Sequence, residues 1–192
     1  MKIRINRYLS KTSVEGPGQR FCIWVQGCSL RCKGCANSHM WDKSGGTEYE
    51  VSDIVDIILR YSDEIEGVTF LGGEPLDQSE AVFEIARSVR EKGLSVLIFT
   101  GYEYDKIKDL PKYKDLENLA DILIDGRYDD NLRDLSRPWV GSSNQKYYFF
   151  SDRYSEDIIA KYRNKFEVHF GENNEVFVNG MGNYDRLKEL IK

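Results

Sequence analysis

Three cysteines lie within eight residues, and they are the residues of this chain best suited to chemistry. Cys28, Cys32 and Cys35 form a C-x3-C-x2-C pattern in the segment GCSLRCKGCAN. An iron–sulfur cluster usually takes four thiolates, so a cluster held by three leaves one iron free for a small ligand. An open coordination position is where a metal site can catalyse a reaction. The spacing is therefore compatible with a cluster that has one exchangeable ligand.

Two other interpretations of these cysteines remain open on spacing alone. Together with His39 they read C-x3-C-x2-C-x3-H, which would suit a closed structural zinc site. Free cysteines are also often small buried hydrophobic residues, but three so close together are too dense for that. The fourth cysteine, Cys22, lies in an apolar segment, and we interpret it as a buried core thiol.

The composition is that of an ordinary globular protein. The chain has 192 residues, 41% hydrophobic and 31% charged, which suits one compact α/β domain spanning residues 1–192. It has a net charge of −5 and no long Lys/Arg run, so nothing indicates a nucleic-acid partner. No apolar run approaches the roughly 18 residues of a membrane helix, and the N-terminal segment lacks a secretory signal pattern. We therefore expect a cytoplasmic protein without a membrane partner, where clustered cysteines indicate metal or redox chemistry.

Strand-like and helix-like segments alternate along the chain, as in a mainly parallel α/β sheet. The apolar residues Val51, Ile54, Val55, Ile58 and Leu59 have helical spacing and predict a helix with Ser52 as its N-cap. A second predicted helix spans about Ser79 to Lys92 and ends before Gly93. A broken helical stretch follows Tyr102. The predicted strands are Phe21–Gln26, Gly67–Leu71, Leu94–Phe99, Ile122–Ile124, Lys146–Phe150 and a hairpin of Phe166–Phe170 with Val176–Val178 around Gly171–Asn174; a last helix covers Tyr184–Ile191.

Short glycine-containing motifs follow these strands. The cysteine segment follows the first one, and Gly72–Pro75, Thr100–Tyr102 and Asp125–Arg127 follow the next three. Ligands of parallel α/β folds bind at the carboxyl ends of the strands. We therefore expect these separate motifs to gather at one rim of the sheet and to form one site.

In their order along the chain, these motifs resemble one known family. The chain resembles the radical S-adenosylmethionine (SAM) activating enzymes of glycyl radical proteins, most closely the activators of anaerobic (class III) ribonucleotide reductase. The resemblance covers roughly residues 4–146, and a structural zinc site would require none of the motifs beyond the cysteines. The motifs are Gly16–Gly18, Gly27–Asn37, Gly72–Pro75, Phe99–Tyr102, Asp125–Tyr128 and Trp139–Gln145.

This resemblance implies a fold and two cofactors. The fold would be a partial (β/α) barrel of the radical SAM type with mainly parallel strands. Its core would span about 4–146, followed by a C-terminal extension over about 147–192 that has no assigned role. Cys28, Cys32 and Cys35 would bind three irons of a 4Fe–4S cluster, and SAM would chelate the fourth iron through its amino and carboxylate groups.

The resemblance also assigns contacts to SAM by position in the motifs. The turn formed by Gly72, Gly73 and Glu74 would lie near the methionyl amino group, because glycine allows close backbone approach and a carboxylate suits an ammonium. Asp125 and Arg127 would contact the ribose and carboxylate of SAM. Two further cofactor-binding residues are Thr100, at a strand end near the same ligand, and Asn37, in the cysteine motif.

The implied activity is reductive cleavage of SAM to a 5′-deoxyadenosyl radical. The radical would abstract hydrogen from a glycine of a partner glycyl radical enzyme, such as anaerobic ribonucleotide reductase. Reduced flavodoxin or ferredoxin would supply the electron. The alternatives are a stand-alone radical SAM enzyme that modifies a peptide or small molecule, and a non-enzymatic zinc-binding module. Two features have no assigned role: the run Gly141–Gln145, and Gly34 in place of the aromatic residue that many radical SAM enzymes carry before the last cysteine.

Overall fold

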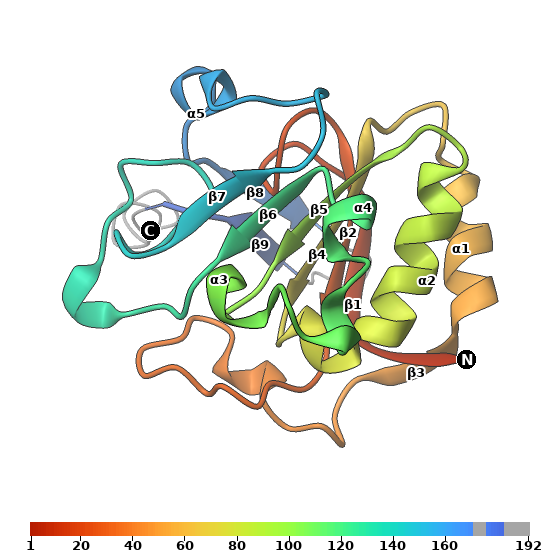
Figure 1. Ribbon diagram of the computed structural model, residues 1–192, viewed down its shortest axis with the longest axis horizontal. Helices are drawn as coiled ribbons and strands as arrows, with labels where there is room; N and C mark the ends of the chain where they lie inside the picture. The colour runs from red at the N-terminus through yellow and green to blue at the C-terminus, as the bar shows by residue number, and fades with distance from the viewer. Residues whose placement is uncertain (171–175, 183–192) are drawn as a thin grey trace.

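The computed structural model describes residues 1–170 and 176–182 (Figure 1). The expected turn Gly171–Asn174 and the expected helix Tyr184–Ile191 lie outside the described residues. Within the described part, the two longest helices cover one face of a single large sheet, and a separate hairpin lies on the other. No helix in this part is long and apolar enough to cross a membrane.

The large sheet has seven strands in the order β3-β1-β2-β4-β5-β6-β7. The four strands β2, β4, β5 and β6 pair in parallel at its centre, and β3, β1 and β7 are antiparallel to their neighbours. The fold is thus mixed α/β with a mostly parallel central sheet, as expected. The sheet is open, with β3 and β7 at its edges. The strands are β1 (Lys2–Thr12), β2 (Arg20–Val25), β3 (Thr47–Glu50), β4 (Gly67–Gly72), β5 (Ser95–Phe99), β6 (Ile122–Asp125) and β7 (Lys146–Phe149).

The helices differ from the expected ones mainly at their ends. Helix α1 (Val51–Leu59) begins one residue before the expected N-cap Ser52, so that assignment is wrong: the capping position is Glu50. The reason is that the Val51 N–H donates to the carbonyl of Met1 (2.9 Å), which satisfies the helix start without a side-chain cap. The other helices are α2 (Ser79–Arg90), α3 (Tyr104–Ile107), α4 (Leu116–Leu119), α5 (Asp157–Lys161) and short 3-10 turns at Ser38–Met40, Pro75–Gln78, Pro111–Tyr113 and Asp130–Leu132.

Alternation along the central strands divides the core between the two faces of the sheet. In β2, Phe21 and Ile23 face the large apolar cluster under α1 and α2, whereas Cys22 and Trp24 face the other side. Cys22 is fully buried, in agreement with the core interpretation, and its burial raises the pKa of the thiol well above its usual range. Helices α1 to α4 therefore cover one face, whereas Ile158 of α5 packs with Leu97, Ile122 and Ile124 on the other face, where the strand-end loops also lie.

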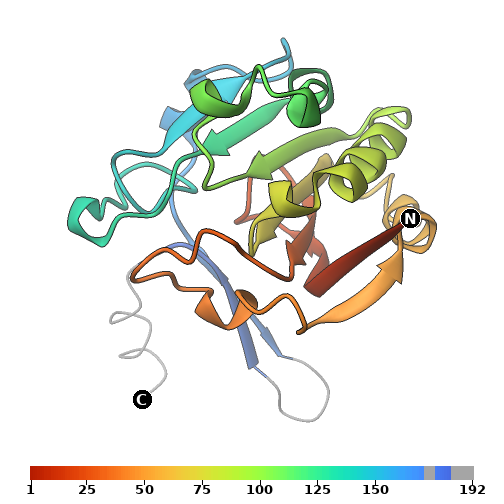
Figure 2. The same cartoon turned by 60° about the horizontal axis from the view of Figure 1, so that its bottom comes forward.

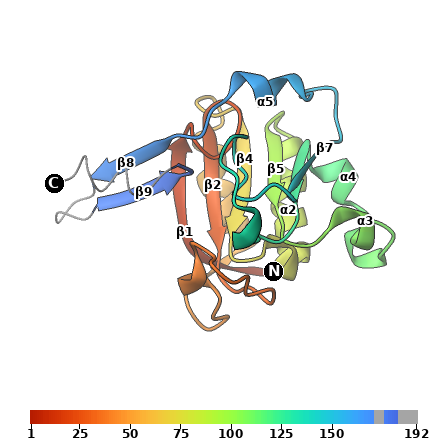
Figure 3. The same cartoon turned by 90° about the vertical axis from the view of Figure 1, so that its left-hand side faces the viewer.

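The C-terminal hairpin stands apart from this core. Strands β8 (Phe166–Phe170) and β9 (Val176–Gly180) pair only with each other among the described strands. Figures 2 and 3 show the hairpin projecting from the body of the molecule on the face opposite α1 and α2. Its base lies beside the large sheet.

A buried arginine ties the loop before β2 to the middle of the sheet. The Arg20 side chain is fully buried, and its guanidinium donates to Pro17 O (3.2 Å) and Thr69 Oγ1 (2.6 Å). It also donates to Val68 O (2.7 Å) and to Oγ (2.9 Å) and O (3.3 Å) of Ser95. A buried charge is tolerated only when its donors are satisfied, so this network fixes the positions of β4, β5 and the preceding loop relative to one another.

We predict that Arg20→Leu lowers the free energy of unfolding by about 3 kcal/mol, because the buried carbonyl and hydroxyl acceptors would lose their donor. Urea unfolding followed by far-UV circular dichroism measures the change. The control Arg60→Leu removes an exposed arginine just after α1, and should change stability by less than about 0.5 kcal/mol. Equal losses in the two variants would contradict a structural role for the Arg20 network.

Candidate functional site

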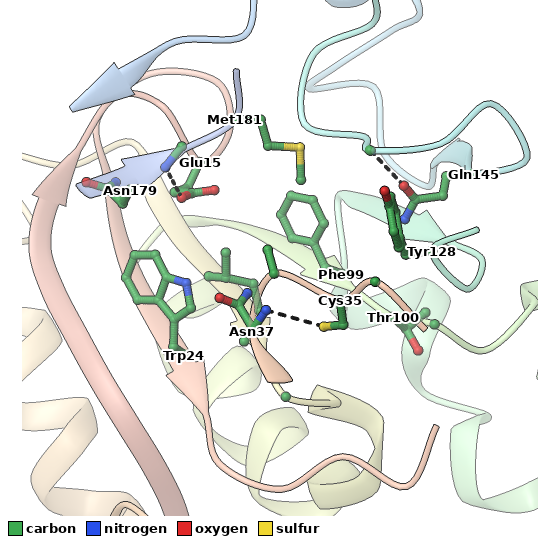
Figure 4. A pocket seen from close by; sticks show the side chains of 18 of the residues that line it. Glu15, Trp24, Cys35, Asn37, Phe99, Thr100, Tyr128, Gln145, Asn179 and Met181 are labelled. Atoms are coloured by element: carbon green, nitrogen blue, oxygen red, sulfur yellow. Dashed lines mark hydrogen bonds between the residues drawn. The ribbon is translucent and has the colours of Figure 1, made fainter. Parts of the chain in front are cut away.

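A cavity of about 470 Å³ lies at the carboxyl ends of the parallel strands. Figure 4 shows Cys35, Asn37 and Thr100 on one side of it, and Glu15 and Met181 toward the opposite side. The expected gathering of the strand-end motifs is therefore found in space. The predicted site residues that line the cavity are Cys35, Asn37, Gly72, Gly73 and Thr100.

The cysteine loop is fastened at its two ends. Gly27 N donates to Met40 O (2.8 Å) and Cys28 N donates to Trp41 O (3.2 Å), so both ends are held in register after β2. Gly27 has φ +95°, a left-handed conformation that favours glycine and turns the chain out of the strand. Of the three motif cysteines, only Cys35 lines the cavity.

The three thiols are the donor type that an iron–sulfur cluster requires, but they do not converge on one point in this structure. Cys28 is buried, which raises the pKa of its thiol, whereas Cys32 and Cys35 are partly exposed. Across residues 1–170 and 176–182, no three His, Cys, Asp or Glu side chains lie close enough together to hold a metal. His39 is exposed, so the zinc set of three cysteines and this histidine is not assembled either. By type and position, three thiols on one loop beside a cavity fit a cluster with an open side.

The glycine turn after β4 packs directly against the start of the cysteine loop. Gly73 N donates to Val25 O (2.9 Å), and Glu74 N donates to Gly27 O (2.9 Å). A Cβ on Gly73 would lie 2.2 Å from Gly27 O, and a Cβ on Gly72 would lie 2.7 Å from Trp24 Cα. Only glycine permits this approach of the two backbones, which forms one wall of the cavity.

The carboxylate of Glu74 lies behind that wall. It is 1% exposed and accepts hydrogen bonds from Thr100 Oγ1 (2.7 Å), Leu76 N (2.9 Å) and Gly101 N (2.8 Å). Burial raises the pKa of this carboxyl to about 7. In this arrangement Glu74 positions the Thr100–Gly101 turn, and it is not among the residues that line the cavity.

Asp125 and Arg127 also lie outside the cavity lining. Alternation in β6 places Asp125 on the helix-covered face with Leu123, and its carboxylate accepts a hydrogen bond from Tyr104 N (2.7 Å). Burial raises the pKa of Asp125. Arg127 is exposed, and its guanidinium donates to the carbonyl of Leu30 in the cysteine loop. The two residues thus brace the neighbouring loops.

The run Gly141–Gln145, for which the sequence suggested no role, holds the loop after β6. The Gln145 side chain accepts from Gly141 N (2.8 Å) and donates to Gly126 O (3.1 Å). Asn144 Nδ2 donates to Arg127 O (2.8 Å). This run therefore sets the path of the chain past the cavity.

The family model for the 4Fe–4S single cluster domain matches residues 14–148, which is most of the chain. The chain belongs to this family. The anaerobic ribonucleoside-triphosphate reductase-activating protein of Enterobacteria phage T4 is 31% identical over 72% of the chain and 89% of its own length. The corresponding Escherichia coli K12 protein is 29% identical over 73% of the chain and 94% of its own length. The expected resemblance to radical SAM activating enzymes is thus confirmed.

Two other matches cover less of the proteins concerned. The pyruvate formate-lyase-activating enzyme of Clostridium pasteurianum is 35% identical over 67% of the chain, but the chain spans only about half of that enzyme, 54% of its length. The crystal structure of QueE from Escherichia coli aligns with a TM-score of 0.43 at 20% identity over 53% of each chain. This weak structural likeness adds nothing to the family relationship.

Several cavity residues of this 4Fe–4S domain were not predicted from the sequence. Trp24 and Phe99 lie on the cavity face of β2 and β5, and the Arg7 guanidinium lies 4.1 Å from the Trp24 ring centroid. Strand alternation could have identified the two aromatic residues. Glu15 and Met181 are brought to the cavity by the loop before β2 and by the C-terminal segment, and no local pattern indicates this.

We predict that Glu74→Gln changes how stability depends on pH. Because the folded pKa of about 7 lies above the ordinary 4.5, the folded chain keeps a proton that the unfolded chain releases. That stabilisation is complete below the unfolded pKa and is lost as the pH rises through 7. The free energy of unfolding of the wild type minus that of the variant should therefore fall by about 1 kcal/mol from pH 6 to pH 8.

Urea unfolding of both proteins at the two pH values measures this difference. Burial also raises the pKa of the Glu15 carboxyl to about 7. Because Glu15 is present in both proteins, its contribution cancels in the difference between their free energies of unfolding. A difference that is constant with pH would show that Glu74 is already ionised at pH 6.

We predict that Gly73→Ala destabilises the chain more than Gly93→Ala. At Gly93, with φ +81°, a Cβ meets nothing within 4 Å, so the variant should lose only about 1 kcal/mol for its left-handed backbone. At Gly73 the new Cβ would overlap the Gly27 carbonyl and push the two loops apart. We expect a loss of about 3 kcal/mol in urea unfolding. Equal losses would mean that the contact between the loops is not tight.

Proposed function

We propose that this chain is the activating enzyme of a glycyl radical enzyme, and that its target is an anaerobic ribonucleoside-triphosphate reductase. The main support is the match to reductase-activating proteins over 89% and 94% of their length, against 54% for the pyruvate formate-lyase-activating enzyme. The position of the cysteine loop beside a strand-end cavity also supports a cluster-dependent reaction in that cavity.

In this proposal Cys28, Cys32 and Cys35 hold a 4Fe–4S cluster, and SAM is the second cofactor. When bound, the two cofactors supply reductive cleavage of the S–C bond of SAM and abstraction of hydrogen from a partner glycine. The electron would come from reduced flavodoxin or ferredoxin. We also propose that the open sheet is a partial (β/α) barrel of the radical SAM type, in a single domain with its core at about 4–146.

In this proposal, the chain's own residues bind and orient the cofactors and keep water out of the cavity. Gly72 and Gly73 expose backbone that a ligand can approach closely, and Asn37 and Thr100 are polar groups on the same cavity wall. Trp24, 2% exposed, adds an apolar surface to the cavity lining, which keeps water from a reactive species. Glu74, Asp125 and Arg127 remain proposed SAM contacts, although in the structure they brace loops.

We predict that the chain, reconstituted anaerobically with iron and sulfide, carries one 4Fe–4S cluster. Its reduced EPR signal should shift when SAM is added. With the anaerobic ribonucleoside-triphosphate reductase of the same organism, it should form deoxyadenosine and a glycyl radical EPR signal on the reductase. Cys35→Ala should lose the cluster and the glycyl radical. Cys22→Ala is the matched control and should keep both, because Cys22 is a core thiol of β2.

The alternatives give different results in the same experiment. Deoxyadenosine without a glycyl radical on the reductase would favour a stand-alone radical SAM enzyme. One zinc and no iron after reconstitution would favour a structural metal module. Either result would overturn the proposed activity.

A further inference from the structure

The C-terminal hairpin closes one side of the cavity. Residues Val178–Gly182, at the base of β9 and just after it, belong to the cavity lining together with the cysteine loop. Figure 4 shows the Met181 side chain directed toward the Phe99 ring, above Cys35. A segment that follows the hairpin thus occupies space in front of the strand ends.

The hairpin lies outside the part of the chain that the family shares. The family match ends at residue 148, and 147 aligned residues account for 94% of the Escherichia coli reductase-activating protein. The family match therefore ends before β8 and β9. Closure of the cavity by this segment is an addition to the shared site.

Polar contacts fasten the base of the hairpin to the end of β1 and the loop that follows it. The Glu167 carboxylate accepts hydrogen bonds from Thr12 Oγ1 (2.5 Å), Ser13 N (2.8 Å) and Ser13 Oγ (2.6 Å). Asn179 Nδ2 donates to Thr12 Oγ1 (2.9 Å), and Gly180 N donates to Glu15 Oε1 (2.8 Å). Such hydrogen bonds replace bonds to water and contribute modest net stability.

The hairpin does not extend the buried apolar clusters of the described chain. The three buried apolar clusters of the described chain contain no residue beyond Tyr162. Instead, the hairpin leaves apolar side chains in solvent, including Phe170, which is 81% exposed, and Val176, which is 53% exposed. An element that projects from the body and lies outside its buried apolar clusters can detach without disrupting a core.

We propose that the C-terminal hairpin is a reversible cover on the cavity, and that a polypeptide segment of a partner reaches the Cys35 side only after the hairpin base has moved. The inference rests on the proposed function for the identity of that partner, the glycyl radical enzyme. The closed cover lowers the apparent affinity for the partner by the fraction of molecules in which the cavity is open.

The first test uses the full-length chain without metal and a bulky maleimide under anaerobic reducing conditions. Glu167→Ala removes three hydrogen bonds of the fastening without changing a residue that lines the cavity. We expect alkylation of Cys35, quantified by peptide mass spectrometry, to become about tenfold faster. Cys32, which is not part of the cavity lining, should be alkylated at an unchanged rate. An unchanged rate at Cys35 overturns the cover.

Two controls accompany this test. Glu91→Ala removes an exposed carboxylate after α2 and should leave the rate at Cys35 unchanged. Cys22 is fully buried and should remain unlabelled in every folded variant. If labelling of Cys22 shows that Glu167→Ala disturbs the fold, the test is repeated with Thr12→Val. This nearly isosteric change removes the hydrogen bonds of Thr12 to Glu167 and Asn179.

The second test uses the reconstituted enzyme with its reductase partner. We expect Glu167→Ala to lower the reductase concentration that gives half-maximal glycyl radical formation by about tenfold, with the maximal yield unchanged. An unchanged or higher half-saturating concentration would show that the hairpin completes the site, and would overturn the proposal. If the wild type forms no glycyl radical at any reductase concentration, the proposed function fails, and the alkylation rates still decide whether the hairpin covers the cavity.

Discussion

One buried carboxylate connects the loops on which the site depends. The backbone N–H of Glu74 donates to Gly27 at the start of the cysteine loop, and its side chain accepts from Thr100 and Gly101 after β5. A buried carboxylate without donors would be very costly. The turn after β4 is therefore stable only where donors from the next strand end reach it. The cysteine loop, packed on that turn, takes its position from the same constraint.

The central strands were predictable because each is defined locally. β2, β4, β5 and β6 are short runs of buried aliphatic and aromatic residues bounded by glycine or polar residues. The first strand was missed because it buries only one face near its start. Ile3 and Ile5 are buried there, but Lys2, Arg4 and Asn6 between them give the segment a polar character. Strand β1 forms because β2 and β3 pair with it from both sides, which no local pattern records.

The site was predictable to the level of motifs but not of side-chain directions. Cysteine and glycine spacing correctly brought Cys35, Gly72 and Gly73 to one cavity. The direction of Asp125 follows from the pleat of β6, where Ile122 and Ile124 face away from α1 and α2 and the alternate residues Leu123 and Asp125 face toward them. Its placement was thus derivable in principle. The contact between Glu15 and Gly180 joins residues 165 positions apart, and it depends on how the whole chain packs.

Glu15 links the hairpin to the sheet through one hydrogen bond of its side chain. Its backbone carbonyl accepts a hydrogen bond from Thr69 Oγ1 on β4 (2.9 Å), so the residue belongs to the sheet whether or not the hairpin is seated. Its side chain is the acceptor for Gly180. Burial of that carboxyl raises its pKa to about 7, which means that the closed arrangement disfavours the charged form. The seated hairpin gives this carboxyl one hydrogen bond from Gly180 N, and a single hydrogen bond contributes only modest net stability, as the proposed opening of the hairpin requires.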